Sequence, residues 1–191
     1  ATHPFARVVT ENILMCCNSL DLSYIRLIRD ENQMTEEDNI VYVSDIDEAI
    51  RYLQDTKGKI FITTGSKELH KFTQLNNYKE RCYARVLSTV DVVKECKEIG
   101  FEGKNICFMQ GPFSEEFNYA QIKMIDAKYV VTKSSGANGG FLEKCNAAIK
   151  AGCTLIVINR PDDNIPEDLK MNFKEVELLL RNRFKFNVNV N

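Results

Sequence analysis

The sequence predicts an α/β fold, with a doubly wound, mostly parallel sheet that carries helices on both faces. Two observations predict it. Short β-branched runs alternate with helix-period segments, and turns that contain glycine follow several of the apolar runs. Because helix amino ends direct unpaired N–H groups toward the crevice beyond the carboxyl ends of the strands, we expect ligands to bind there.

The first part of the chain predicts two helices and two short strands. Apolar residues at spacings of three and four predict the helices, and brief β-branched runs predict the strands. The second helix is expected to be capped by Ser44 or Asp45 and to end at Gly58. In chain order, the four elements are the helix 5–20, the strand 24–28, the strand 40–43 and the helix 45–56.

From Lys59 onward the pattern predicts five strands, each but the last followed by a helix. The first of these helices is SKELHKF at 66–72, and a last helix over 173–183 is expected to close the domain. Parallel strands joined in this way form a Rossmann- or flavodoxin-like sheet. The predicted strands contain Ile60, Cys82, Ile106, Val130 and Leu155.

This pattern predicts one complete domain and part of another. Residues 58–191 are expected to form a complete C-terminal Rossmann-like domain, and residues 1–57 a remnant of a similar N-terminal one. The remnant has too few elements to bury both faces of a parallel sheet. It also begins on ATHPF, which reads like a strand end that runs into a helix, so we expect the sequence to be a fragment. An uncovered remnant could pair with a second chain, which makes a homodimer one expected state.

Composition excludes several classes of protein. A net charge of -2 without a basic stripe argues against a nucleic-acid partner. No apolar run approaches the roughly 20 residues of a membrane span, and the amino end has no secretory signal. Seven cysteines without a C-x-x-C motif predict reduced, mostly buried thiols in a cytoplasmic protein. The only histidines, His3 and His70, lack metal-ligand neighbours, so no metal site is expected.

Two turns offer groups for an anionic ligand. TTGSKEL at 63–69 follows the first strand of the complete domain, at the expected switch point, and supplies hydroxyls and the cation of Lys67. It lacks P-loop spacing, so nucleotide hydrolysis is not expected. The alternative is that Ser66 only caps a helix. The second turn, SSGANGG at 134–140, precedes a helix predicted over 138–151 and follows Lys133, which predicts an anion site; the alternative is a turn needed only for its backbone geometry.

A third turn, Gln110 to Ser114, precedes a helix that begins with two glutamates. Their charges already complement the helix dipole, so a phosphate would be repelled there. We expect this turn to face a macrocyclic ligand or another domain. The alternative is that Ser114 merely caps the helix.

Five segments, in order and spacing, resemble the precorrin-6A reductase family, which includes the cobalt-precorrin-6A reductases. The resemblance implies two Rossmann-like domains that enclose a cofactor, NADPH or NADH, and a tetrapyrrole substrate. It also implies reduction of one double bond of a corrin precursor in cobalamin biosynthesis. The segments are ATHPFA at 1–6, TTGSKEL at 63–69, ARVL at 84–87, QGPFSEEFN at 110–118 and VTKSSGANGGFLEK at 131–144.

With this resemblance the turns acquire expected roles, although no catalytic residue is identified. The nicotinamide supplies the hydride, so the protein has mainly to bind, orient and exclude water. Lys133, Lys67 or Arg85 could stabilise developing charge. The residues expected to bind cofactor are Lys133, Ser135, Gly136, Gly139 and Gly140. Those expected to bind substrate are His3, Thr64, Gly65, Ser66, Lys67, Arg85, Gly111, Pro112 and Ser114.

One feature of the family is missing from this sequence. The glycine-rich GGT-type turn expected ahead of Ala1 is not present, and no G-x-G-x-x-G occurs. A noncatalytic module that binds an anion or a tetrapyrrole, without the nucleotide-binding half, is therefore the alternative function.

Overall fold

A computed structural model describes residues 7–28, 39–134, 140–159, 165–166 and 169–184. The chain divides into two units. Unit 1 comprises residues 1–31 and 161–191, and unit 2 comprises residues 32–160. Within the described ranges, no helix combines the length and the apolar composition that a membrane crossing requires.

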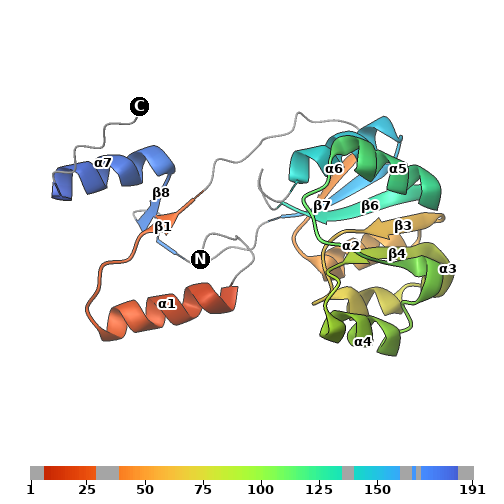
Figure 1. Cartoon of the computed structure of the whole chain (residues 1–191), viewed down its shortest axis with the longest axis horizontal. Helices are drawn as coiled ribbons and strands as arrows, with labels where there is room; N and C mark the ends of the chain where they lie inside the picture. Colours follow the sequence, from red (N-terminus) through yellow and green to blue (C-terminus); the bar gives the residue numbers. More distant parts are fainter. Residues whose placement is uncertain (1–6, 29–38, 135–139, 160–164, 167–168, 185–191) are drawn as a thin grey trace. The chain divides into compact units, whose positions relative to one another are not determined.

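Unit 2 contains a six-stranded sheet in which every neighbouring pair is parallel (Figure 1). Its order is β2-β7-β6-β3-β4-β5. The chain passes from β3 outward to β4 and β5, and then returns to the other side of β3, where β6 is followed by β7. The doubly wound parallel sheet is thereby confirmed, with its switch point between β3 and β6. The strands are β2 (Ile40–Val43), β3 (Lys59–Ile62), β4 (Cys82–Val86), β5 (Ile106–Phe108), β6 (Ala127–Lys133) and β7 (Thr154–Ile158).

Helices flank this sheet. Helices α5 and α6 lie side by side and pack against each other over one face (Figure 1). Two further elements, η1 and η2, are 3-10 helices rather than α-helices. The helices of unit 2 are α2 (Ile46–Gln54), η1 (Leu69–Gln74), α3 (Tyr78–Arg81), α4 (Val90–Glu98), η2 (Gly103–Asn105), α5 (Glu115–Ile125) and α6 (Phe141–Lys150).

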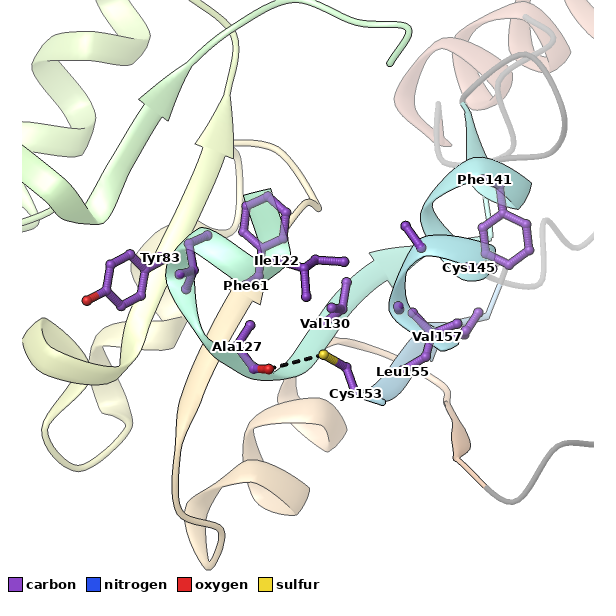
Figure 2. Packing of buried hydrophobic residues seen from close by; sticks show 13 residues of the cluster. Phe61, Tyr83, Ile122, Ala127, Val130, Phe141, Cys145, Cys153, Leu155 and Val157 are labelled. Carbon is purple, nitrogen blue, oxygen red and sulfur yellow. Dashed lines mark hydrogen bonds between the residues drawn. The ribbon is translucent and has the colours of Figure 1, made fainter. Parts of the chain in front are cut away.

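The core beneath α5 and α6 is built from alternate strand residues, since successive side chains of a strand point to opposite faces. Phe61, Val130 and Leu155 from three adjacent strands meet Ile122 of α5 in one buried cluster (Figure 2). At its edge the thiol of Cys153 donates to the carbonyl of Ala127 at 3.1 Å. The predicted role of the cysteines in packing is confirmed there.

The predicted helix caps are confirmed. Asp45 accepts a hydrogen bond from the backbone N–H of Glu48 at 2.8 Å, and the carboxylate of Glu48 accepts one from the N–H of Ser44 at 2.7 Å. The two hydrogen bonds occupy backbone N–H groups at the start of α2, and those that Ser44 donates lower the pKa of Glu48. Ser114 caps α5 by accepting from the N–H of Phe117 at 3.3 Å.

The boundary predicted at residue 57 does not coincide with the division between the units. Strand β2 pairs with β7 along four residues, from Ile40 with Leu155 to Val43 with Ile158. Helix α2 also contacts these two strands. Local periodicity carries no signal for pairing between segments more than 100 residues apart. The sequence therefore assigned β2 and α2 to the N-terminal remnant, although they pack with unit 2. The helix predicted over 66–72 is also corrected, because the short 3-10 helix η1 takes its place.

Unit 1 joins the two ends of the chain. It contains α1 (Arg7–Ser19), β1 (Arg26–Leu27), β8 (Lys170–Met171) and α7 (Phe173–Phe184). Strands β1 and β8 are parallel, and the N–H of Ile28 donates to the carbonyl of Met171 at 2.9 Å. The last helix was predicted to close the sheet domain. Instead it follows β8, a strand that pairs with β1. That residues 1–57 are the remnant of a second Rossmann-like domain stays a prediction.

Among the described glycines of unit 2, Gly58, in the turn between α2 and β3, should tolerate a side chain least. Its φ is +112°, and an added Cβ would lie 2.7 Å from Cγ of Lys128. We expect Gly58→Ala to lower the free energy of unfolding by roughly 1–3 kcal/mol, measured by urea denaturation. Gly103→Ala is the control, because Gly103 has a φ of +58° and open space around it. Equal losses in the two variants would contradict this account.

Candidate functional site

The switch point brings together the turns that follow β3 and β6. The N–H and the hydroxyl of Thr63 both donate to the carbonyl of Val131, each at 2.9 Å, which ties the first turn to β6. Thr64 follows, with its Oγ1 buried and without a hydrogen-bond partner among the described residues. Gly65 then turns the chain at a φ of +87°. The structure thus places the predicted TTGSK turn at the carboxyl edge of the sheet, beside β6.

Ser66 and Lys67 line a surface pocket of about 390 Å³ between η1 and α4. The pocket is also lined by His70, Glu95 and Glu98. Two carboxylates beside one lysine disfavour an anion within this pocket. Lys67 is an exposed residue.

Lys133 is paired with a carboxylate that the sequence analysis did not consider. Its Nζ lies 2.9 Å from Oε2 of Glu68, across the switch point. Lys71 extends the network, at 3.5 Å from Glu68 and 2.8 Å from Asp47. Burial raises the pKa of Glu68, but the hydrogen bond and charge of Lys133, with those of Lys71, lower it overall. The positive charge predicted beside the glycine-rich turn is therefore shared with Glu68.

The described residues of the glycine-rich turn at 134–140 are its first and last, Ser134 and Gly140. Ser135, Gly136 and Gly139 lie outside the described residues, as does His3. Gly140 has a φ of 62° and precedes the first residue of α6, which begins later than predicted. Glu143 lies in the first turn of α6, and its Oε2 is buried without a hydrogen-bond partner in the described part of the chain. A carboxylate at this point opposes an anion at the helix start.

Arg85 is a buried cation near the carboxyl end of β4. It is 7% exposed, and it donates to Oε1 of Gln121 at 2.6 Å and to Oδ1 of Asn118 at 2.9 Å. Its guanidinium carbon lies 4.0 Å from the centroid of the Phe113 ring and 5.4 Å from that of Phe61. Burial lowers the pKa of Arg85 to about 10, so the group is charged at neutral pH. Among the described residues, no carboxylate forms an ion pair with it.

Lys144 of α6 is the second desolvated cation. Burial, together with the charge of Arg85, lowers the pKa of Lys144 to about 8. In the described part of the structure its ammonium has neither an ion pair nor a side-chain hydrogen bond. Lys144 was not predicted as a site residue, and its one signal in the sequence is its position a helical turn after the glycine-rich segment.

The Gln110–Ser114 turn contributes its aromatic residue to this region. The exposed residues Gly111, Pro112 and Ser114 were predicted to contact substrate, and that role stays a prediction. Phe113, which was not predicted, covers the guanidinium of Arg85 and stacks on Phe117 with ring centroids 5.2 Å apart. The same helix supplies Asn118 and Gln121, so α5 and its entry turn hold Arg85 in place.

A family model described as "Precorrin-6x reductase CbiJ/CobK" matches residues 1–181. The cobalt-precorrin-6A reductase of Priestia megaterium is 37% identical over 163 residues, which cover 84% of this chain and 64% of that protein. The enzyme of the same name from Methanocaldococcus jannaschii is 36% identical, over 87% of this chain and 64% of its own length. The chain thus spans a little less than two thirds of these curated relatives.

A solved structure named "CobK precorrin-6A reductase" resembles the chain with a TM-score of 0.74 and 21% sequence identity. The likeness covers 95% of this chain and 71% of that one. At this identity it supports the α/β fold, with mostly parallel sheets and flanking helices.

Proposed function

The chain belongs to the precorrin-6x reductase family, and from this membership we propose that the protein reduces one double bond of precorrin-6A or its cobalt form in cobalamin biosynthesis. The single observation that carries the proposal is the family match over residues 1–181, which includes both units. The position of the TTGSK turn at the switch point supports it, because ligands of doubly wound sheets bind there. All seven cysteines are free thiols, which supports a cytoplasmic location.

In this proposal the residues of the chain bind and orient the substrate. A corrin precursor carries several carboxylates, which require cations and hydrogen-bond donors. Thr64 and Ser66 offer hydroxyls, and Lys67 offers an exposed ammonium in the same turn. The buried hydroxyl of Thr64 lacks a partner among the described residues, so a ligand group could satisfy it.

The reducing cofactor is proposed to be a nicotinamide dinucleotide, NADPH or NADH, which supplies the hydride when bound. The described residues fit its phosphates only weakly. Gly140 leaves the start of α6 without a side-chain cap, but Lys133 is paired with Glu68, and Glu143 places a carboxylate in the first turn. That Lys133, Gly140 and their neighbours bind the cofactor stays a prediction.

Replacing Lys67 tests the substrate side of the proposal. We expect Lys67→Met to lower kcat/KM for the corrin precursor about 10- to 100-fold if its exposed ammonium binds a substrate carboxylate outside the pocket that Glu95 and Glu98 line. The measurement is the oxidation of NADPH and of NADH by the natural-length protein, with precorrin-6A and cobalt-precorrin-6A compared. Lys94→Met on α4 is the matched control, since it removes the same charge from an exposed residue that does not line the pocket of Lys67. Equal kinetics in the two variants would exclude Lys67 from the site.

A further inference from the structure

Two positive charges share a buried region at the carboxyl edge of the sheet. Arg85 is the second-to-last residue of β4, and Lys144 is the fourth residue of α6. Phe113 links them: its ring lies 4.0 Å from the guanidinium carbon of Arg85, and its carbonyl oxygen would lie 3.8 Å from a Cβ at Gly140, at the start of α6. The charge of Arg85 also acts on Lys144. Burial of two cations in one place is unfavourable unless negative charge compensates it.

The described residues supply little of that negative charge. The acceptors for Arg85 are the side-chain amide oxygens of Asn118 and Gln121, which are neutral. Glu143 is the carboxylate of α6 that attracts Lys144, and its influence is smaller than that of burial or of Arg85. The thiols of Cys107 and Cys145 also face the pair. Two cations and one carboxylate leave a net positive charge.

A purely structural role does not account for this arrangement. A guanidinium has five N–H donors, and the amides of α5 use one on each of two nitrogen atoms, so three have no partner among the described residues. The ring of Phe113 covers the guanidinium and holds its plane. Lys144 forms no side-chain hydrogen bond in the described part of the chain. Unsatisfied, desolvated cations of this kind are typical of binding sites.

We propose that Arg85 and Lys144 together bind one oxyanion of a ligand, which supplies the negative charge missing from this region. The chemistry suits a carboxylate of a tetrapyrrole or a phosphate of a dinucleotide, since both accept hydrogen bonds from a guanidinium and an ammonium. Only the identity of the ligand rests on the proposed function; the subsite itself does not.

The test that needs no variant is an NMR titration of Lys144 in the natural-length protein. The ¹⁵N shift of its Nζ is followed against pH alone, with uroporphyrin as a tetrapyrrole carboxylate, and with inorganic pyrophosphate. An anion bound beside Lys144 raises its pKa from about 8 toward the ordinary value of 10.5. A rise with uroporphyrin alone assigns the subsite to the macrocycle, and a rise with pyrophosphate alone assigns it to the dinucleotide. No rise with either probe overturns the proposal.

Calorimetric titration of variants gives a second test. Arg85→Met and Lys144→Met should each weaken binding of the effective probe at least about tenfold, whereas Lys104→Met, on the exposed η2, should leave it unchanged. Unchanged affinity in the first two variants overturns the subsite. These outcomes are distinct from failure of the proposed function, which is seen as binding of tetrapyrrole and nucleotide without reduction.

Discussion

Lys144→Met is expected to raise the free energy of unfolding at pH 7 by about 3 kcal/mol. Methionine has a similar volume and carries no charge, so the variant keeps the packing of α6 and removes a desolvated ammonium. The size follows from the pKa of Lys144, which is about 8 in the folded chain instead of 10.5. Few single substitutions stabilise a protein this much, and urea denaturation monitored by tyrosine fluorescence would measure it.

The pH dependence of this gain identifies its cause. Between pH 8 and 10.5 the unfolded chain binds more protons at Lys144 than the folded chain does, so wild-type stability gains with rising pH in that window. Below pH 8 the full penalty applies, and above 10.5 it has disappeared. The advantage of Lys144→Met should therefore shrink from pH 8 to 10.5.

Buried thiols change the stability of both proteins in the same way. Burial raises the pKa of Cys82 and of Cys145 to about 12, so the unfolded chain loses these protons first and both proteins become less stable above pH 9. The difference between wild type and variant removes the effect of Cys82, whereas part of the effect of Cys145 remains, because the charge of Lys144 acts on that thiol. Lys104→Met serves as the control and should show no pH-dependent difference. A destabilised Lys144→Met protein with a parallel pH profile would show that the ammonium is not desolvated.

Phe61→Ala is expected to lower the free energy of unfolding of unit 2 by about 3–5 kcal/mol. Phe61 is 1% exposed on β3, a central strand, and packs in the cluster under α5 and α6 (Figure 2). Its ring also lies beside the guanidinium of Arg85, so the cavity would open next to a desolvated charge. Urea denaturation measures the loss.

Phe173→Ala is the matched control for this substitution. Phe173 begins α7 and is 71% exposed, so its truncation should change stability by no more than about 0.5 kcal/mol. If both variants lost the same stability, the assignment of Phe61 to the core would be wrong.

The sequence predicted those features that depend on neighbouring residues. The strands of unit 2 from β3 to β7, the caps at Asp45 and Ser114 and the helix α7 follow from local periodicity and capping chemistry. The pairing of β2 with β7 and of β1 with β8 joins segments far apart in the chain, for which no local signal exists. For that reason the predicted domain boundary and the position of the last helix needed correction.

In the candidate site, too, local motifs were predicted from the sequence and contacts between distant segments were not. The turn at Thr64 to Lys67 and the buried Arg85 were named from the sequence because motifs mark them. The pairing of Lys133 with Glu68, 65 residues away, was not foreseeable, and it changes the expected charge at the switch point. The burial of Lys144 depends on how α6 packs against α5, which the order of residues does not reveal.

The reductase proposal is tested most directly by the mass of the tetrapyrrole after reaction. The natural-length protein would be mixed without oxygen with cobalt-precorrin-6A and a reduced nicotinamide dinucleotide that carries deuterium at the transferred position. The account predicts a product heavier by one deuterium from the cofactor and one proton from water. A tetrapyrrole that binds the protein and is recovered with unchanged mass would contradict it, and would favour a noncatalytic binding module.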